Sequence, residues 1–342
     1  MQEDFFPLYT SNPGFGRGLS FWAVLPNISW CLSLGSCNID AMFRVIAVVF
    51  LLCPNVVLAE EVDRAGLLPA YVLQLPATAT NILIVETGSA TLYEFSNTDH
   101  GLGLPQQRYV SIGQNGVGKR RTGDRRTPLG IYFISEQLDT SRMHERYGPT
   151  AFPLDYPNEW DRLNERSGDG IWIHGVTPGS DHRPPLDTDG CVALGNSELL
   201  ELAEVLVPHV TPVVITRDIR WDAEDNIAAL RDELNVVLDT WKQSLLSGDL
   251  HRYFSLYDSD FQYRGMGRDE WLAYRQPSFA VAVDDVSLDE VVLLADPEHK
   301  GLFLSRFRQT IVKPERTVVT IKRLYWKRSE DGGLKIVAED NG

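Results

Sequence analysis

The residues best suited to covalent chemistry lie in the stretch IWIHGVTPGSDHRPPLDTDGCVALGN, which runs from Ile171 to Asn196. Cys191 follows a Thr-Asp-Gly turn, and His174 stands seventeen residues earlier, directly before Gly175. A cysteine becomes a nucleophile when a base or a cation helps to deprotonate it, and histidine is the usual partner. A glycine turn also gives exposure and backbone N–H groups that can face a developing oxyanion. The pattern therefore predicts a Cys–His nucleophilic pair.

Residues 42–59, MFRVIAVVFLLCPNVVLA, have the pattern of a secretory signal peptide. Arg44 precedes an apolar run that is too short to span a bilayer comfortably, and small residues follow at the positions that signal peptidase reads. We expect cleavage near Ala59 and an exported protein, in the periplasm or the cell envelope. Residues 1–41 are not a normal start for such a segment. We interpret them as a spurious or disordered extension upstream of a start at Met42.

The cysteine count limits the other roles open to Cys191. The chain has four cysteines, of which Cys31, Cys37 and Cys53 precede the expected cleavage site. The exported chain then keeps a lone thiol, which cannot form an intramolecular disulfide or a cysteine-rich zinc site. A buried structural cysteine remains the alternative interpretation of this residue.

The overall charge of the chain argues against one class of partner. The sequence carries 32 basic and 47 acidic side chains, a formal net charge of −15. Phosphate backbones are bound by basic patches, so nucleic acid is not expected as a partner. With 342 residues, the chain is long enough to build two hydrophobic cores.

The elements that must position the Cys–His pair belong to a strand-dominated domain at residues 80–217. Apolar runs separated by turns predict its strands, beginning with a hairpin in NILIVETGSATLYEF. SELLELAEVLVPH has helical spacing and a serine cap, and TPVVITRD returns to a strand. Residues 60–79, which precede the domain, are interpreted as a linker.

Residues 222–342 predict a second domain of different build. In DAEDNIAALRDELNVVLDTWKQSLLSGD, apolar residues recur at helical spacing over about six turns. Alternating strands follow it, and one long helix packed on a curved antiparallel sheet is the economical arrangement. The predicted fold class is therefore α+β.

The motifs of residues 80–217 resemble the L,D-transpeptidase catalytic domain, also called the YkuD domain. That family has His-Gly, a loop, then Ser/Thr-His-Gly-Cys and Ile/Val-Arg-Met-x-Asn. The matching residues here are His174, Gly175, Thr188, Gly190, Cys191, Val192 and Asn196, together with the TPLGIY strand at 127–132. Residues 222–342 resemble the NTF2-like (SnoaL-like, Cds6-type) α+β cone that is appended to some exported L,D-transpeptidases. The residues that carry this second resemblance are Trp241, Ser247, Gly248, Asp249, Tyr253, Tyr257, Asp260, Phe261 and Trp271.

The resemblance implies that Cys191 attacks the carbonyl of an L-to-D peptide bond in a peptidoglycan stem peptide. His174 would donate and accept the proton, and the backbone carbonyl of Gly175 would orient it. The acyl-enzyme would pass to an amine acceptor (a second stem peptide, a D-amino acid or a lipoprotein) or to water. The resemblance implies no cofactor and no metal.

Two positions depart from the family pattern. Asp189 replaces the second histidine, and Ala193 replaces the arginine. A carboxylate two residues before the thiol raises the thiol pKa unless a cation pairs with it. Arg183 is the candidate partner or a carboxylate clamp, and a solvated loop charge is the alternative.

The remaining candidates concern the substrate and the oxyanion. The set comprises Thr188, Asp189, Gly190, Asn196, Arg183 and Tyr156. Tyr156 would lean into the site, unless it only stabilises a turn, and His182 would stand in for the missing histidine, unless it is simply exposed.

Three functions stay open at this point. The first is an L,D-transpeptidase, and the second is a peptidoglycan hydrolase of the L,D-carboxypeptidase or amidase type on the same scaffold. The segment AFPLDYPNEWDRLNERSGDGIWIHG favours hydrolysis, because it resembles a branch whose members include an enzyme that hydrolyses peptidoglycan–lipoprotein links. The third is a non-catalytic wall-binding protein, against which the retained His174–Cys191 pair argues.

Overall fold

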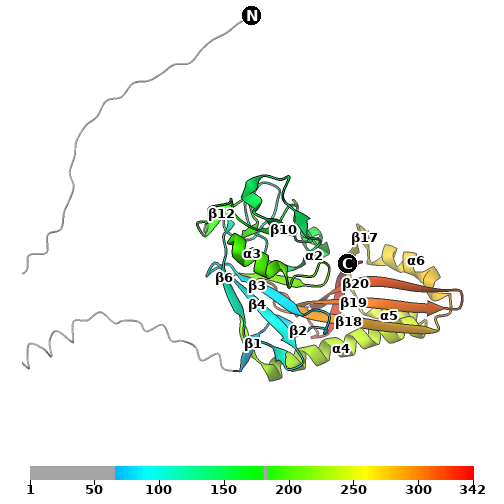
Figure 1. Ribbon diagram of the computed structural model, residues 1–342. Coiled ribbons are helices and arrows are strands. Elements are labelled where there is room, and N and C mark those ends of the chain that lie inside the picture. Colours follow the sequence, from blue (N-terminus) through cyan, green and yellow to red (C-terminus); the bar gives the residue numbers. More distant parts are fainter. Residues whose placement is uncertain (1–65, 181–182) are drawn as a thin grey trace, which may run out of the picture. The chain divides into compact units, whose positions relative to one another are not determined.

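Apolar strands form a six-stranded mixed sheet at the centre of the first domain (Figure 1). Its strands are β3 (Asn81–Glu86), β4 (Thr91–Thr98), β5 (Gly101–Leu102), β6 (Gln106–Tyr109), β8 (Gly130–Phe133) and β14 (Pro212–Thr216). The order is β5-β4-β3-β14-β8, with β6 beside β4, and β3 runs parallel to β14. Strand alternation sends Leu83 and Val85 into one core and Ile82 and Ile84 into another. β3 is apolar from Ile82 to Val85 because both of its faces are covered there.

A smaller four-stranded sheet carries the candidate nucleophile and base, in the order β13-β11-β10-β9. Its strands are β9 (Leu138–Asp139), β10 (Thr150–Pro153), β11 (Trp172–His174) and β13 (Val192–Ala193). A separate parallel pair is formed by β7 (Ile112–Gly113) and β12 (Leu186–Thr188). The helical elements of this domain are η1 (Glu145–Tyr147), α2 (Glu159–Leu163) and α3 (Asn196–Ala203). The predicted helix after the Cys191 turn is thus present as α3, but the predicted serine cap is wrong, because Gly195 is the N-cap and no side chain caps the helix.

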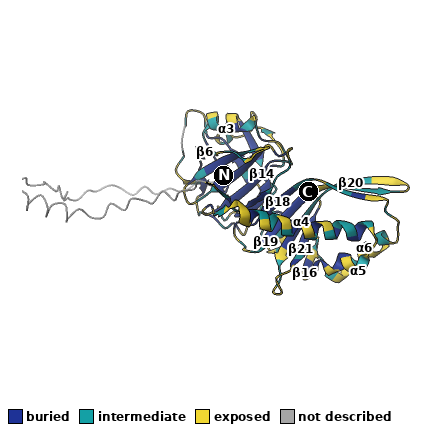
Figure 2. Ribbon diagram, turned by 90° about the horizontal axis from the view of Figure 1, so that it is seen from below, coloured by how far each residue is buried: buried dark blue, intermediate teal, exposed yellow. Residues whose placement is uncertain are grey.

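The second domain is one long helix against a sheet, as its periodicity predicts, but the sheet is antiparallel only in part, because β16 runs parallel to β21. Its helices are α4 (Glu224–Leu246), α5 (Leu250–Ser255) and α6 (Arg268–Phe279), and its strands are β16 (Tyr257–Tyr263), β17 (Met266–Gly267), β18 (Asp285–Ala295), β19 (Leu302–Lys313), β20 (Arg316–Arg328) and β21 (Leu334–Asp340). Buried and exposed residues alternate along α4 (Figure 2). The apolar stripe of α4, which includes Leu234, Leu238 and Trp241, packs into the same core as Phe307 and Trp326 of the sheet.

The segment before the first domain is not the linker that we predicted over residues 60–79. β1 (Leu67–Pro69) pairs with β15 (Trp221–Ala223), and β2 (Val72–Gln74) forms the edge of the second domain's sheet beside β18. Tyr71 between them is fully buried, and its hydroxyl donates to the carbonyl of Asp218 at 3.0 Å. Strands of three residues are too short for an apolar period to show in the sequence.

The two domains share a core within the compact unit that spans residues 63–342. Ile84 and Val214 of the first sheet pack in one apolar cluster with Leu294, Leu304 and Tyr325 of the second. Separating the two domains would remove packing contacts from the side chains of both domains in this cluster. The second domain therefore helps to stabilise the central sheet of the first domain.

The computed structural model describes residues 66–180 and 183–342. The expected extension at 1–41, the signal segment at 42–59 with its cleavage near Ala59, and His182 lie outside these residues. Over the described ranges, no helix has both the length and the apolar character required for a membrane span.

Candidate active site

Strand pairing brings His174 and Cys191 together. β11 and β13 run parallel, with Ile173 opposite Val192 and His174 opposite Ala193. The amide of Leu194 donates to the carbonyl of His174 at 3.0 Å, which continues the pairing. Cys191 directly precedes β13, so the register places it beside Trp172 and diagonally across from His174.

The environment of His174 fixes its tautomer. Its Nδ1 lies 2.7 Å from the carbonyl oxygen of Gly175. A carbonyl oxygen only accepts hydrogen bonds, so Nδ1 carries the proton and Nε2 keeps a free lone pair. The ring is 3 % exposed, and the ring of Tyr147 stands edge-on to it at 5.2 Å. Burial lowers the pKa of His174 to about 4, so the imidazole is a neutral base at physiological pH.

The thiol of Cys191 is also neutral at rest. Its side chain is 9 % exposed, and the S–H group donates to the carbonyl of Gly170 at 3.3 Å. Burial raises the pKa of the Cys191 thiol, and a backbone hydrogen bond with Trp172 and the charge of Arg146 oppose this rise only in part. The resting state is therefore a thiol beside a neutral imidazole, and not a preformed ion pair. Such a pair reacts by general-base catalysis, in which the proton leaves as sulfur attacks.

This arrangement predicts how alkylation of Cys191 depends on pH. The rate of modification by iodoacetamide should keep rising about tenfold per pH unit from pH 6 through pH 8.5. This small reagent is not aligned by the site for proton transfer to His174, so it reacts only with the thiolate, and the thiol pKa is raised. The measurement is mass spectrometry of the peptide that contains Cys191, at a series of pH values. A rate that is already constant from about pH 5 upward would instead indicate a thiolate–imidazolium pair.

The turn before Cys191 is held by threonine and glycine. The Thr188 hydroxyl donates to the carbonyl of Cys191 at 2.7 Å and accepts from the amide of Gly190 at 3.1 Å. Gly190 has φ 126°, and a Cβ there would lie 2.7 Å from the carbonyl oxygen of Arg126. The Gly190 N–H thus already donates to Thr188 and is not free to bind an oxyanion, contrary to our prediction. Thr188 and Gly190 shape the turn.

Asn196 also positions the chain. Its amide accepts from the N–H of Val176 at 2.8 Å and donates to the carbonyl of Val176 at 2.9 Å. Its Oδ1 would lie 2.2 Å from a Cβ added at Gly175, so only glycine fits there. Asn196 therefore fixes the segment that follows His174. It does not serve as the substrate contact that we predicted.

Asp189 has two cationic partners, and neither is Arg183. Its carboxylate is 61 % exposed and lies 3.6 Å from Nε of Arg125 and 3.8 Å from Nη1 of Arg146. Arg183 instead pairs with Asp187, Nε to Oδ2, at 2.9 Å. The predicted Arg183–Asp189 pair is wrong, because the nearer carboxylate four residues away takes the guanidinium. In the sequence, Arg125 belongs to the basic stretch GKRRTGDRRT, which could have indicated it as a candidate. Arg146 belongs to no recognisable motif.

Tyr156 does not reach the site. It is buried in the core of the first domain, edge-on to Tyr132 at 5.9 Å. Its hydroxyl donates to the carbonyl of Ser167 at 3.2 Å. The turn-stabilising alternative is the correct one for this residue.

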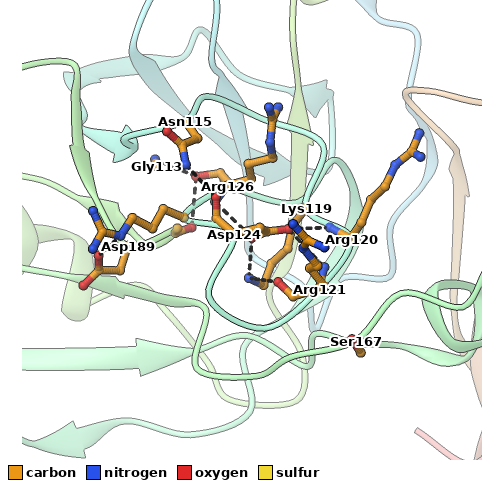
Figure 3. A network of polar contacts seen from close by, with 12 residues as sticks. Gly113, Asn115, Lys119, Arg120, Arg121, Asp124, Arg126, Ser167 and Asp189 are labelled. Atoms are coloured by element: carbon orange, nitrogen blue, oxygen red, sulfur yellow. Dashed lines mark hydrogen bonds and ion pairs between the residues drawn. The ribbon is translucent and has the colours of Figure 1, made fainter.

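The loop at 117–127 contacts the Cys191 turn. The Thr127 hydroxyl donates to the carbonyl of Gly190 at 2.9 Å. Asp124 fixes the loop: its carboxylate binds Lys119 Nζ at 2.9 Å and accepts from the amides of Arg120 at 2.8 Å and Arg121 at 3.0 Å (Figure 3). Burial acts to raise the pKa of Asp124, but these hydrogen bonds outweigh it and lower the pKa to about 2. Asp124 is therefore a permanent anion within a basic loop.

Residues 66–180 and 183–342 contain no set of side chains arranged as metal ligands. No three His, Cys, Asp or Glu side chains of these ranges are grouped to hold a metal ion.

Comparison with known proteins agrees with both domains. Residues 80–215 match the family model of the L,D-transpeptidase catalytic domain (YkuD), and residues 233–340 match that of the Cds6 C-terminal NTF2-like domain. Among solved structures, Bd1075 of Bdellovibrio bacteriovorus is 24% identical with a TM-score of 0.67, over 81% of this chain and 98% of that chain. The helical cell shape determining protein Pgp2 of Campylobacter jejuni is 25% identical with a TM-score of 0.64, over 76% of this chain and 91% of that chain. No curated protein matches the chain in sequence.

Proposed function

We propose that this chain, which carries an L,D-transpeptidase catalytic domain at residues 80–215 and a Cds6-type NTF2-like domain at 233–340, cleaves peptidoglycan stem peptides through a thioester at Cys191. The observation that carries the proposal is the hydrogen bond between Nδ1 of His174 and the carbonyl of Gly175. It leaves Nε2 free as a base, on the strand next to the thiol. A structural cysteine would need no such partner.

The reaction follows from these protonation states. As the sulfur of Cys191 attacks the substrate carbonyl, its proton passes to Nε2 of His174. The tetrahedral intermediate collapses, the C–N bond breaks, and the imidazolium returns the proton to the leaving amine. The thioester is then attacked by an acceptor amine or by water. His174 takes the proton of that nucleophile, and the thiol is regenerated.

One feature favours hydrolysis of the terminal residue, as in an L,D-carboxypeptidase. Asp189, Arg125 and Arg146 together carry a net charge of +1 beside the nucleophile. Such a group attracts a carboxylate and repels an ammonium ion, which is the usual form of an acceptor amine. Arg146 is half exposed, and its guanidinium lies 4.9 Å from the centroid of the Tyr147 ring, so it is both accessible and held. The carboxylate of a terminal D-amino acid would bind there.

Replacing Arg146 by alanine should lower kcat/KM for a stem tetrapeptide about 10- to 100-fold, since a charge-assisted hydrogen bond contributes about 1.5–3 kcal/mol. Steady-state kinetics with the free acid and with its C-terminal amide test this. The variant should lose most of its preference for the acid. The exposed Arg142 of the same loop offers the matched control, Arg142→Ala, which should change neither value. An unchanged preference in Arg146→Ala would reject the carboxylate clamp.

The decisive assay is mass spectrometry of disaccharide tetrapeptides incubated with the protein, with and without a free D-amino acid. Loss of the terminal residue alone would establish a carboxypeptidase. Exchange of that residue or dimer formation would establish a transpeptidase. If neither product appears, on tetrapeptide, pentapeptide and lipoprotein-linked substrates alike, the wall-binding alternative stands and the proposed activity is rejected.

We also propose that the protein works outside the cytoplasm. The composition of residues 42–59 supports export, and the substrate of the family lies in the cell envelope. Fractionation of cells, with N-terminal sequencing of the exported form, tests both the location and cleavage near Ala59.

A further inference from the structure

A strongly basic cavity is lined by the loop that precedes Thr127, which contacts the Cys191 turn. Its volume is about 700 Å³, and the cations that line it are Lys119, Arg120, Arg121, Arg126, Arg166 and Arg217. The carboxylates in its lining are those of Asp124 and Glu298. Such a concentration of positive charge is unexpected in a chain whose net charge is −15. It calls for a partner of opposite charge.

Two of the six cations are neutralised within the protein. Lys119 binds Asp124 at 2.9 Å, and Arg166 binds Asp161, which lies behind the cavity wall, at 3.0 Å. Their charges therefore do not attract a ligand strongly.

The other four cations leave a surplus of charge. In the part of the chain that the structure describes, the guanidinium groups of Arg120 and Arg121 have no acidic partner. Arg126 donates to the backbone carbonyl of Val117 at 2.9 Å, and Arg217 lies 3.9 Å from Glu298. Four guanidinium groups thus face one distant carboxylate. Their mutual repulsion is relieved only when an anion enters.

The main chain that carries Arg120 and Arg121 is fixed in place before any ligand binds. Asp124 accepts the backbone amides of Arg120 and Arg121, so it holds their main chain without neutralising their side chains (Figure 3). The amide of Ser167 donates to the carbonyl of Arg120 at 3.0 Å and ties the loop to a second segment. Because the loop is already ordered, binding an anion costs only the ordering of the side chains.

Residues of both domains line the cavity. Glu298 and His299 come from the second domain, just after β18, while the basic loop belongs to the first. The same loop touches the Cys191 turn, because Thr127 bonds to the carbonyl of Gly190. The cavity and the Cys191 turn are thus connected through one segment, and Cys191 itself does not line the cavity.

We propose that this cavity binds the carboxylates of a peptidoglycan stem peptide, at a subsite separate from the Cys191 thiol. The choice of peptidoglycan rests on the proposed function. The need for a ligand with at least two anionic groups rests on the surplus of three positive charges that remains after Arg217 is paired with Glu298. Stem peptides carry several carboxylates, and each can accept two parallel hydrogen bonds from one guanidinium.

Calorimetric titration of the full chain carrying Cys191→Ala tests this subsite, because binding can then be measured without turnover. A disaccharide tetrapeptide is the probe, and inorganic tripolyphosphate is the second probe. Arg120→Ala combined with Arg121→Ala should weaken tetrapeptide binding at least tenfold. The matched control combines Arg142→Ala with Arg316→Ala, which removes the same charge from exposed positions outside the cavity, and should leave the affinity within twofold.

The outcomes distinguish the proposed subsite from a general effect of charge, from a phosphate site and from the proposed function itself. Equal weakening by both pairs would mean a general effect of charge and would overturn the subsite. Tripolyphosphate binding that needs Arg120 and Arg121, without such dependence for the tetrapeptide, would assign the cavity to a phosphate ligand and overturn the carboxylate assignment. Turnover by the protein with Cys191 intact is measured separately. An inactive protein that still binds through Arg120 and Arg121 would reject the proposed function and retain the subsite.

Discussion

Replacing Cys191 by alanine is expected to abolish cleavage of stem peptides, with a loss of at least about 10⁴-fold in kcat, because no other group can form the thioester. Cys191 is the single cysteine after residue 53, so no second thiol can substitute for it. The measurement is single-turnover cleavage followed by mass spectrometry, which also detects the acyl-enzyme as added mass on the unaltered protein. That added mass should be absent from the variant.

The fold must survive for this result to have meaning. Cys191→Ser keeps a donor for the carbonyl of Gly170 and a side chain of similar size, so its thermal unfolding should match that of the unaltered protein. Serine should still be nearly inactive, since a neutral imidazole of lowered pKa is too weak a base for a hydroxyl. If either variant cleaves within tenfold of the unaltered rate, sulfur is not the nucleophile.

Replacing His174 by asparagine is expected to lower kcat/KM by about 10³- to 10⁴-fold, the upper part of the range for general-base catalysis. The raised thiol pKa is the reason, because very little thiolate exists near neutral pH without the base. The residual activity should therefore rise about tenfold per pH unit up to about pH 9. The unaltered enzyme should change little between pH 6 and 8, where His174 is neutral and the thiol is protonated.

Asparagine is the suitable replacement because its amide can still donate to the carbonyl of Gly175. His100 lies in an exposed turn, and His100→Asn provides the matched control, with no expected change in rate or in pH profile. A flat pH profile in His174→Asn, or a loss below tenfold, would show that another group removes the proton.

The departures from the family pattern have a common structural consequence. Ala193 stands opposite His174 across the paired strands, so no guanidinium extends from that position. Guanidinium groups instead reach the turn from Arg125 and Arg146, in two different loops, and meet at Asp189. The histidine and arginine of the motif are thus absent at positions 189 and 193. Positive charge still lies beside the thiol. This charge comes from other parts of the chain.

The sequence by itself determined the elements with long, regular patterns and the residues with a motif. The period of α4, the strands of both sheets, and the His174-Gly175 and Gly190-Cys191 pairs could all be identified there, because each is set by neighbours within a few residues. Strands β1 and β2 could not be identified, since three residues show no period.

Tertiary structure alone decided which charges meet and which polar groups are already bonded. The pairing of Asp189 with Arg125 and Arg146, the occupied N–H of Gly190, the buried place of Tyr156 and the basic cavity all depend on segments far apart in the chain. Side-chain partners are chosen through space, by distance and burial, and a linear pattern contains neither. Burial likewise set the protonation states of His174 and Cys191, because the pKa of each depends on how much water the folded chain excludes.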